Sequence, residues 1–221
     1  MLISKIKAAT DSISTKTKLQ TQKLSNEKLN SRLTNIAAIG NKLETCIETI
    51  LAMQSNHIDD STPINEEQKA SLLGALNECG RCIAELSLDD TIVSAFKMQT
   101  DVIEQLLSAH WKQAANTYSA GVINYLTILS DLTPDPKRSI ELQSSIKTQA
   151  SSNSPNKMLV SRFVHDVRAA QEIVDQYKLD PAIQEFLLKV KLRRASIEDL
   201  TSEVTVWLKA NNLTKKLLIS F

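Results

Sequence analysis

Glycine is scarce in this sequence, at only 4 of 221 residues, where about 7 per cent is usual. The 5 prolines lie between periodic hydrophobic segments or at their starts. Tight turns between strands need glycine, asparagine and proline, because these residues favour the backbone angles of turns. The shortage therefore argues against a sheet-rich fold. Apolar residues recur instead at intervals of three and four over long stretches, which predicts an all-α protein.

Aromatic residues are also few, at 4 per cent of the chain, so we expect a core of Leu, Ile, Val and Ala. Aliphatic side chains suit helix packing, in which ridges of one helix fill grooves of the next. We predict long antiparallel or coiled-coil-like helices in the N-terminal part and a compact C-terminal helical bundle. The predicted regions are an N-terminal arm (1–55), a central helical region (56–150) and the bundle (157–221), with a linker at 151–156.

The chain has 3 cysteines, an odd number, and its first residues lack the long apolar run of a secretory signal. A reducing cytoplasm is the compartment that fits such a sequence. The longest uncharged window, 113–130, carries too many polar side chains for a lipid-facing helix. We therefore predict a cytoplasmic protein and expect no membrane partner.

The formal net charge of +1 conceals an uneven distribution. Residues 1–32 carry seven basic and two acidic side chains, residues 59–104 three basic and ten acidic, and residues 186–221 seven basic and three acidic. Basic ends thus flank an acidic middle. This pattern favours electrostatic complementarity within the chain or head to tail between copies. The alternative is a basic surface for nucleic acid.

A seam of apolar residues marks the second half of the N-terminal segment. Its members recur alternately four and three positions apart, which is the spacing of a coiled coil. The stretch before it, 14–28, is mostly polar and can bury little surface. We therefore predict that the segment pairs with a partner chain or a second copy through Leu29, Leu33, Ile36, Leu43, Ile47 and Ile50.

The C-terminal region contains two helix-start signals. Asp180 followed by Pro181 predicts a helix, because Asp caps helix N-termini and Pro favours the first helical position. Ser196 with Asp199 forms a short capping box and predicts a helix that continues to Asn211. The densest basic cluster lies between the two signals. It is either a solvated face or, in the alternative, a nucleic-acid site made of Lys189, Lys191, Arg193 and Arg194.

The sequence contains no recognisable catalytic motif. Cys79 and Cys82 form the one motif-like cysteine pair, but zinc sites require four ligands, and a mid-helix Cys79 fits as a small core hydrophobe. His57, His110 and His165 are scattered, and no nucleophile or phosphate-binding motif accompanies them. We therefore predict that the protein is not an enzyme, with no catalytic residue, cofactor or metal.

The C-terminal tail is apolar and follows two lysines. An exposed apolar terminus is unfavourable, so we expect it to be covered in one of two ways. It folds over the last helices with Phe221 near Trp207, or it binds a partner as a short C-terminal motif through Leu218, Ile219 and Phe221.

Together these features predict a non-catalytic helical interaction protein. It would be a subunit or adaptor of a protein complex, or a homo-oligomer, that pairs through its N-terminal helices. The alternative is a nucleic-acid-binding accessory protein that uses the basic N- and C-terminal segments.

Overall fold

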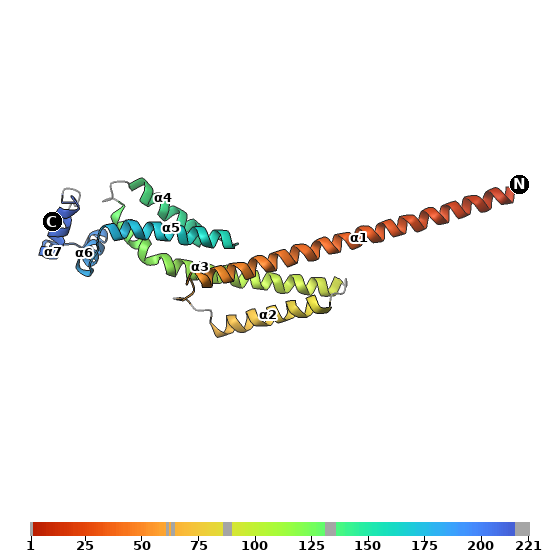
Figure 1. Ribbon diagram of the computed structural model, residues 1–221, viewed down its shortest axis with the longest axis horizontal. Coiled ribbons are helices and arrows are strands. Elements are labelled where there is room, and N and C mark those ends of the chain that lie inside the picture. Colours follow the sequence, from red (N-terminus) through yellow and green to blue (C-terminus); the bar gives the residue numbers. More distant parts are fainter. Residues whose placement is uncertain (1, 61, 63–64, 86–89, 131–135, 215–221) are drawn as a thin grey trace. The chain divides into compact units, whose positions relative to one another are not determined.

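Helices form almost all of the computed structural model (Figure 1). The structure describes residues 2–60, 62, 65–85, 90–130 and 136–214. For residues 2–17, 21 and 82–85 it describes the backbone alone. Within these residues there are seven α-helices, one short 3-10 helix and no strand, which confirms the all-α prediction. In chain order the elements are α1 (Leu2–Ser55), α2 (Glu66–Glu85), α3 (Asp90–Leu129), α4 (Pro136–Ala150), α5 (Lys157–Gln176), α6 (Pro181–Lys191), the 3-10 helix η1 (Ile197–Asp199) and α7 (Ser202–Ala210).

Helix α6 begins where the sequence predicts. The Asp180 side chain accepts a hydrogen bond from the Ile183 amide at 2.9 Å, and Pro181 occupies the first helical turn. The side chain thus satisfies one of the amide groups that a helix N-terminus leaves without a partner.

The prediction of one helix from Ser196 to Asn211 was wrong in its extent. Ser196 and Asp199 do form a capping box, but it opens only the short η1, which Leu200 ends. Helix α7 has its own cap at Thr201, whose side chain accepts from the Val204 amide at 3.3 Å. A capping box stabilises the first turn alone, so it does not decide whether a helix continues beyond that turn.

Four helices end on a residue in the left-handed region that is not glycine, and these residues are His57, Lys178, Arg193 and Asn212. Glycine usually occupies this position because it has no β-carbon to clash with the following carbonyl. None of the glycines in the described residues has a positive φ; all lie inside helices. The protein therefore ends its helices with other residues, and the scarcity of glycine does not prevent left-handed turns.

The chain divides into two compact units. Unit 1 comprises Met1–Ile47 and Glu66–Leu106, and unit 2 comprises Glu48–Asn65 and Leu107–Phe221. Helices α1 and α3 each contribute residues to both units. The predicted region boundaries, at 55, 150 and 157, stay predictions.

In unit 1, α2 and α3 run side by side (Figure 1), and the Cys79 Sγ lies 3.9 Å from the Thr100 hydroxyl. Lys42 of α1 contacts two carboxylates of α3. The buried residues are mostly small or aliphatic: Ile39, Leu43, Cys46, Ala75, Cys79, Phe96, Thr100 and Ile103.

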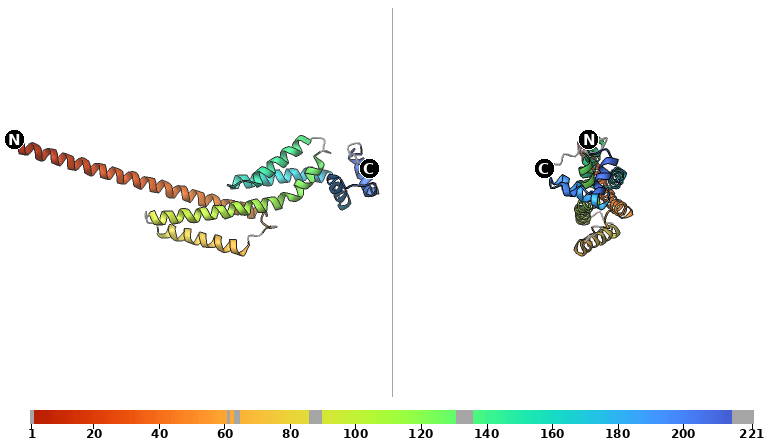
Figure 2. Two further views of the ribbon diagram at one scale, coloured as in Figure 1. Left: turned by 180° about the vertical axis from the view of Figure 1, so that it is seen from behind. Right: turned by 90° about the vertical axis from the view of Figure 1, so that its left-hand side faces the viewer.

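Unit 2 has a core built around aromatic side chains. The rings of Trp111 and Phe163 meet edge to face with centroids 5.1 Å apart, and the Trp111 indole donates to the Gln149 carbonyl at 3.0 Å. Helix α4 packs along α5 (Figure 2). The Trp207 indole in turn donates to the Tyr177 carbonyl, which fixes α7 against the end of α5.

Candidate functional site

The seam predicted on α1 lies on the border between a buried and an exposed face. Leu43 is buried, whereas Leu29, Leu33 and Ile47 are 41, 50 and 41 per cent exposed. Ile36 and Ile50 are half-buried. The buried face of α1 in unit 1 instead consists of Ile39, Leu43 and Cys46. Apart from Leu43, the residues of the predicted seam therefore lie beside the buried face of α1, and the pairing with another chain or copy stays a prediction.

Ion pairs fix the orientation of α1 in unit 1. The Lys42 ammonium lies 2.8 Å from a carboxylate oxygen of Asp101 and 2.6 Å from one of Glu104. The hydrogen bonds that the ammonium donates to these two carboxylates raise the pKa of Lys42. Further along, Arg32 pairs with Asp90 at 2.6 Å. These contacts hold one face of α1 against α3 and leave the apolar stripe of Leu29, Leu33, Ile36 and Ile47, hereafter the α1 stripe, outside the core.

The N-terminal half of α1 buries nothing that the structure describes. Every described side chain of residues 18–31 is exposed, including those of Leu19, Leu24 and Leu29. Figure 1 shows this part of the helix extending beyond α2 and α3 of the same unit. In a protein, a helix gains most of its stability when an apolar face packs on other elements. The described side chains of residues 18–31 lack such packing.

Two of the three cysteines, Cys46 and Cys79, are buried in the core of unit 1. Burial raises the pKa of the Cys46 thiol, which disfavours the reactive thiolate. The side chain of Cys82 lies outside the described residues. Among the side chains that were described, no group of three or more potential metal ligands occurs.

The three histidines occupy different surroundings. His57 is exposed at the end of α1, with its Nδ1 3.1 Å from a carboxylate oxygen of Asp60. His165 is exposed on α5. His110 is buried in unit 2, and its Nε2 atom has no hydrogen-bond partner. Burial lowers the pKa of His110, which favours the neutral imidazole in the folded protein.

The basic cluster of the C-terminal region separates into two parts. The Lys189 ammonium lies 2.7 Å from Asp199 and 2.9 Å from Glu185, and its hydrogen bond lowers the pKa of Asp199 to about 2. Lys191, Arg193 and Arg194 are exposed. Lys189 therefore ties η1 to α6, and only the other three cations are presented to solvent.

Sequence reasoning missed a groove between α3 and α6 in unit 2. Its volume is about 360 Å³, and it is lined by Gly121, Asn124, Tyr125, Ile128, Pro181, Gln184, Glu185 and Leu188. The Tyr125 hydroxyl and the Gln184 side-chain oxygen lie 2.6 Å apart across it. A sequence signal for it existed, because α6 carries apolar residues on more than one face. The tail residues Leu218, Ile219 and Phe221 lie outside the described part of the chain, so their predicted contact near Trp207 stays untested.

None of the described helices combines the length and the apolar character that a membrane span requires. The Gln113–Ser130 window, which is free of charge, carries buried polar residues such as Ser119 instead. No protein-family model, no curated protein and no solved structure matches this chain. The surfaces described above are therefore the basis on which a function can be proposed.

Proposed function

We propose that this protein is a non-catalytic interaction protein, a subunit or adaptor of a complex, which binds a helix of a partner chain or of a second copy along the α1 stripe. The single observation behind the proposal is that Leu29, Leu33 and Ile47 are 41 to 50 per cent exposed on a helix whose adjacent face, through Ile39, Leu43 and Cys46, is buried in unit 1. Covering these residues would extend an existing core.

The expected gain in free energy is large enough to support association. Full burial of a leucine or isoleucine contributes roughly 1.5–3 kcal/mol, and the exposed halves of three such side chains would contribute about half of that each. A partner helix would also add the packing that residues 18–31 lack. A seam of alternating three- and four-residue spacing is suited to such helix pairing.

Charges beside the stripe bear on the kind of partner. In the register of the stripe, Lys18 and Lys23 fall at the positions that flank a two-stranded seam. Side chains at these positions set partner choice through interhelical ion pairs. In a parallel pair of two identical copies, Lys18 of one helix would face Lys23 of the other. The charges therefore favour a partner helix with acidic flanks, or antiparallel pairing, over a parallel homodimer.

A substitution of the stripe tests the proposal. Leu29→Gln with Leu33→Gln removes two exposed apolar side chains without touching the buried face. Leu24→Gln is the matched control, because Leu24 is also exposed but lies about 140° round the helix from Leu29. We expect the stripe variant, and not the control, to lose self-association in light scattering or to lose an identified partner in co-purification. Monomers of all three proteins with no identified partner would contradict the proposal.

The location that we propose is the reducing cytoplasm. The thiol of Cys46 is free and buried, and free buried thiols are usual in reducing compartments. A fluorescent fusion of the full chain, imaged with a compartment marker, tests this part of the proposal.

A further inference from the structure

Helix α6 presents two apolar faces. Ile183, Phe186 and Leu187 are buried in the core of unit 2, whereas Leu188 and Leu192 are 50 and 52 per cent exposed. The two exposed leucines are four residues apart, so they lie on the same side of the helix, one turn above the other. A surface helix needs one apolar face to pack on the core. The second face therefore has no role inside the described unit.

The exposed face of α6 forms one wall of the groove between α3 and α6. Leu188 lines this groove together with Tyr125 and Ile128 of α3. The contact of 2.6 Å between Tyr125 and Gln184 holds the two walls together. Leu192 continues the line of Leu188 beyond the groove, which makes the apolar strip longer than the groove itself.

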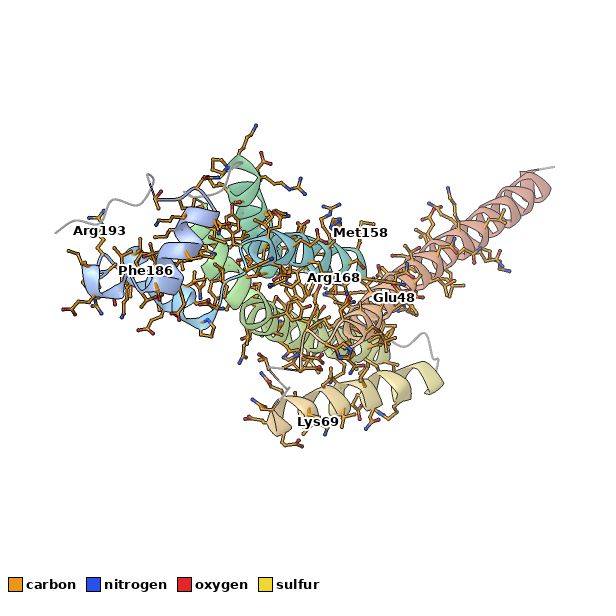
Figure 3. The ribbon with its side chains drawn as sticks, turned by 60° about the vertical axis from the view of Figure 1, so that its left-hand side comes forward. Glu48, Lys69, Met158, Arg168, Phe186 and Arg193 are labelled. Atoms are coloured by element: carbon orange, nitrogen blue, oxygen red, sulfur yellow. The ribbon has the colours of Figure 1, made fainter. Side chains whose placement is uncertain are left out.

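The cations stand at the C-terminal end of this strip. Lys191 is seven residues after Gln184, so it lies two turns further along the same side of α6. Arg193 and Arg194 follow in the turn that ends the helix, and Figure 3 labels Arg193 on the outside of this turn. Two acidic residues near them, Glu185 and Asp199, are both paired with Lys189 instead.

Two backbone hydrogen bonds define this turn. The Arg193 amide donates to the Val190 carbonyl at 3.0 Å, and the Arg194 amide donates to the Lys189 carbonyl at 2.8 Å. With Arg193 at a φ of 54°, this is the Schellman arrangement of a helix C-terminus. The backbone from which the two arginine side chains project thus has a defined conformation beside the strip.

Two other helices end in the same Schellman arrangement. In each, the residue after the left-handed one donates its amide to the carbonyl five residues earlier, and this residue is Ile58 after α1 and Leu213 after α7. Both side chains are fully or almost fully buried. An apolar contact at this position commonly completes the motif. After α6 the same position carries Arg194, which is exposed. The helix end thus lacks its usual apolar contact and displays a cation instead.

We propose that the groove between α3 and α6 and the cations beyond it form a docking site for an acidic amphipathic helix of a partner protein. Aliphatic side chains of that helix fill the groove between Tyr125, Ile128 and Leu188. Its Asp or Glu side chains pair with Lys191, Arg193 and Arg194. The site lies wholly in unit 2 and does not depend on the α1 stripe.

Other anionic or apolar occupants fit the surface less well. Tyr125 is the one aromatic ring in the lining of the groove. It is half-buried and its hydroxyl donates to Gln184, so a nucleic acid finds little on which its bases could stack. The protein's own C-terminal tail begins with Lys215 and Lys216, and the cations of the site would repel these two positive charges.

Fluorescence anisotropy of the full chain with a labelled synthetic helix tests the proposal. The probe has leucines on one face and glutamates along its flanks, and a second probe has lysines in place of the glutamates. We expect only the acidic probe to bind, and its affinity to fall at least about tenfold when salt rises from about 50 to about 500 mM, because the paired charges are screened.

Substitutions locate the binding. Lys191→Gln with Arg193→Gly and Arg194→Gln removes the cations while glycine keeps the left-handed turn, and Leu188→Gln alters the groove. We expect each variant to weaken acidic-probe binding about tenfold or more. Lys178→Gly is the matched control, since Lys178 is another exposed cation in a left-handed helix end, and it should leave binding unchanged. Circular dichroism checks that each variant folds; if the triple variant does not, Arg193→Gly alone replaces it.

Several results would overturn the proposal. These are equal binding of both probes, no binding of the acidic probe, or loss of binding in Lys178→Gly. Tighter binding of an RNA oligonucleotide or of phosphatidylserine vesicles than of the acidic probe, lost in the triple variant, would assign the site to those partners instead. Tighter probe binding after truncation at Thr214 would assign it to the tail. Since Leu29→Gln with Leu33→Gln should not affect probe binding, failure here is distinct from failure of the α1 stripe.

Discussion

Unit 1 and unit 2 bury very different side chains. By sequence, unit 2 holds both tryptophans, all three tyrosines and three of the four phenylalanines, and unit 1 holds only Phe96. Among the largest fully buried side chains that the structure describes, Ile103 alone belongs to unit 1. Aromatic rings bury the most area per residue. The core of unit 1 is therefore almost wholly aliphatic, whereas unit 2 adds most of the aromatic rings to aliphatic side chains such as Leu126 and Ile146.

The difference in buried side chains indicates where each unit obtains its stability. Unit 1 combines small buried residues such as Ala75 and Cys79 with ion pairs of α1 to α3. Ion pairs that are partly exposed contribute little. We therefore expect its helices to depend more on the partner that we propose for the α1 stripe, whereas unit 2 has a larger core of its own.

Removal of Trp111 should have the largest effect on this comparison. Trp111→Ala deletes a fully buried ring that contacts Phe163 and donates to Gln149, and such deletions destabilise by about 3–5 kcal/mol. We expect unit 2 to lose hydrogen-exchange protection strongly and unit 1 to lose less. Trp111→Phe, which keeps a ring but removes the indole donor, should cost clearly less. Equal loss of protection in both units would show that they do not differ in this way.

A deletion in unit 1 provides the counterpart. Leu43→Ala removes a buried side chain of α1 and should destabilise by about 2–4 kcal/mol, with loss of protection centred on residues 66–106. The measurement is the same hydrogen exchange. If loss of protection instead centred on residues 136–214, the assignment of Leu43 to the core of unit 1 would be wrong.

The periodicity of α1 is visible in the sequence and led to a predicted pairing seam, which stays a prediction. Which residues of α1 pack on the rest of unit 1 cannot be recognised in the same way. Spacing by fours and threes fits two neighbouring lines, one through Ile39 and Cys46 and the other through Gly40 and Ile47. The choice depends on the surface against which the helix packs, and here Lys42 lies between Asp101 and Glu104. Such long-range pairs cannot be recognised from the local sequence. Local signals fared better, since Asp180 caps α6 as predicted.

The groove escaped prediction for a related reason. Tyr125 and Gln184 are 59 residues apart, and only the packing of α3 against α6 joins them. The cluster at 189–194 was visible in the sequence, but its division into a paired Lys189 and three exposed cations follows from the turn at Arg193. Sequence patterns therefore indicated the elements and the charges, whereas the surfaces required the tertiary arrangement.

Acid should weaken unit 2 through His110. Burial lowers the pKa of this side chain in the folded state, so the unfolded chain binds the proton more readily. Stability is then fully present above the ordinary histidine pKa of about 6.5 and falls as the pH drops below it. Urea unfolding at several pH values measures the effect. His110→Gln should remove most of this dependence, and His165→Gln, at an exposed site, is the control that should retain it.

The ion pairs of unit 1 should matter less. Lys42→Met removes a cation that contacts Asp101 and Glu104, but all three side chains are 37 to 38 per cent exposed. Water screens such pairs, so we expect a loss of at most about 1 kcal/mol and a smaller one at high salt. A loss as large as that from Leu43→Ala would mean that charge, and not packing, holds α1 on unit 1.

The smallest expected effect is a gain, at the left-handed end of α5. Lys178 has a φ of 46°, and its amide donates to the Asp175 carbonyl at 3.1 Å. Lys178→Gly relieves the clash of the β-carbon, worth about 1–2 kcal/mol, but it also gives the unfolded chain more freedom, which offsets about 0.5–1 kcal/mol. We therefore expect a net stabilisation of about 0.5 kcal/mol, measured as a shift of the urea midpoint. Because Asn tolerates this conformation better than Lys, Lys178→Asn should give part of the gain, whereas Lys178→Ala, which keeps the β-carbon, should give none. A gain from alanine equal to that from glycine would show that backbone strain at this position is not the cause.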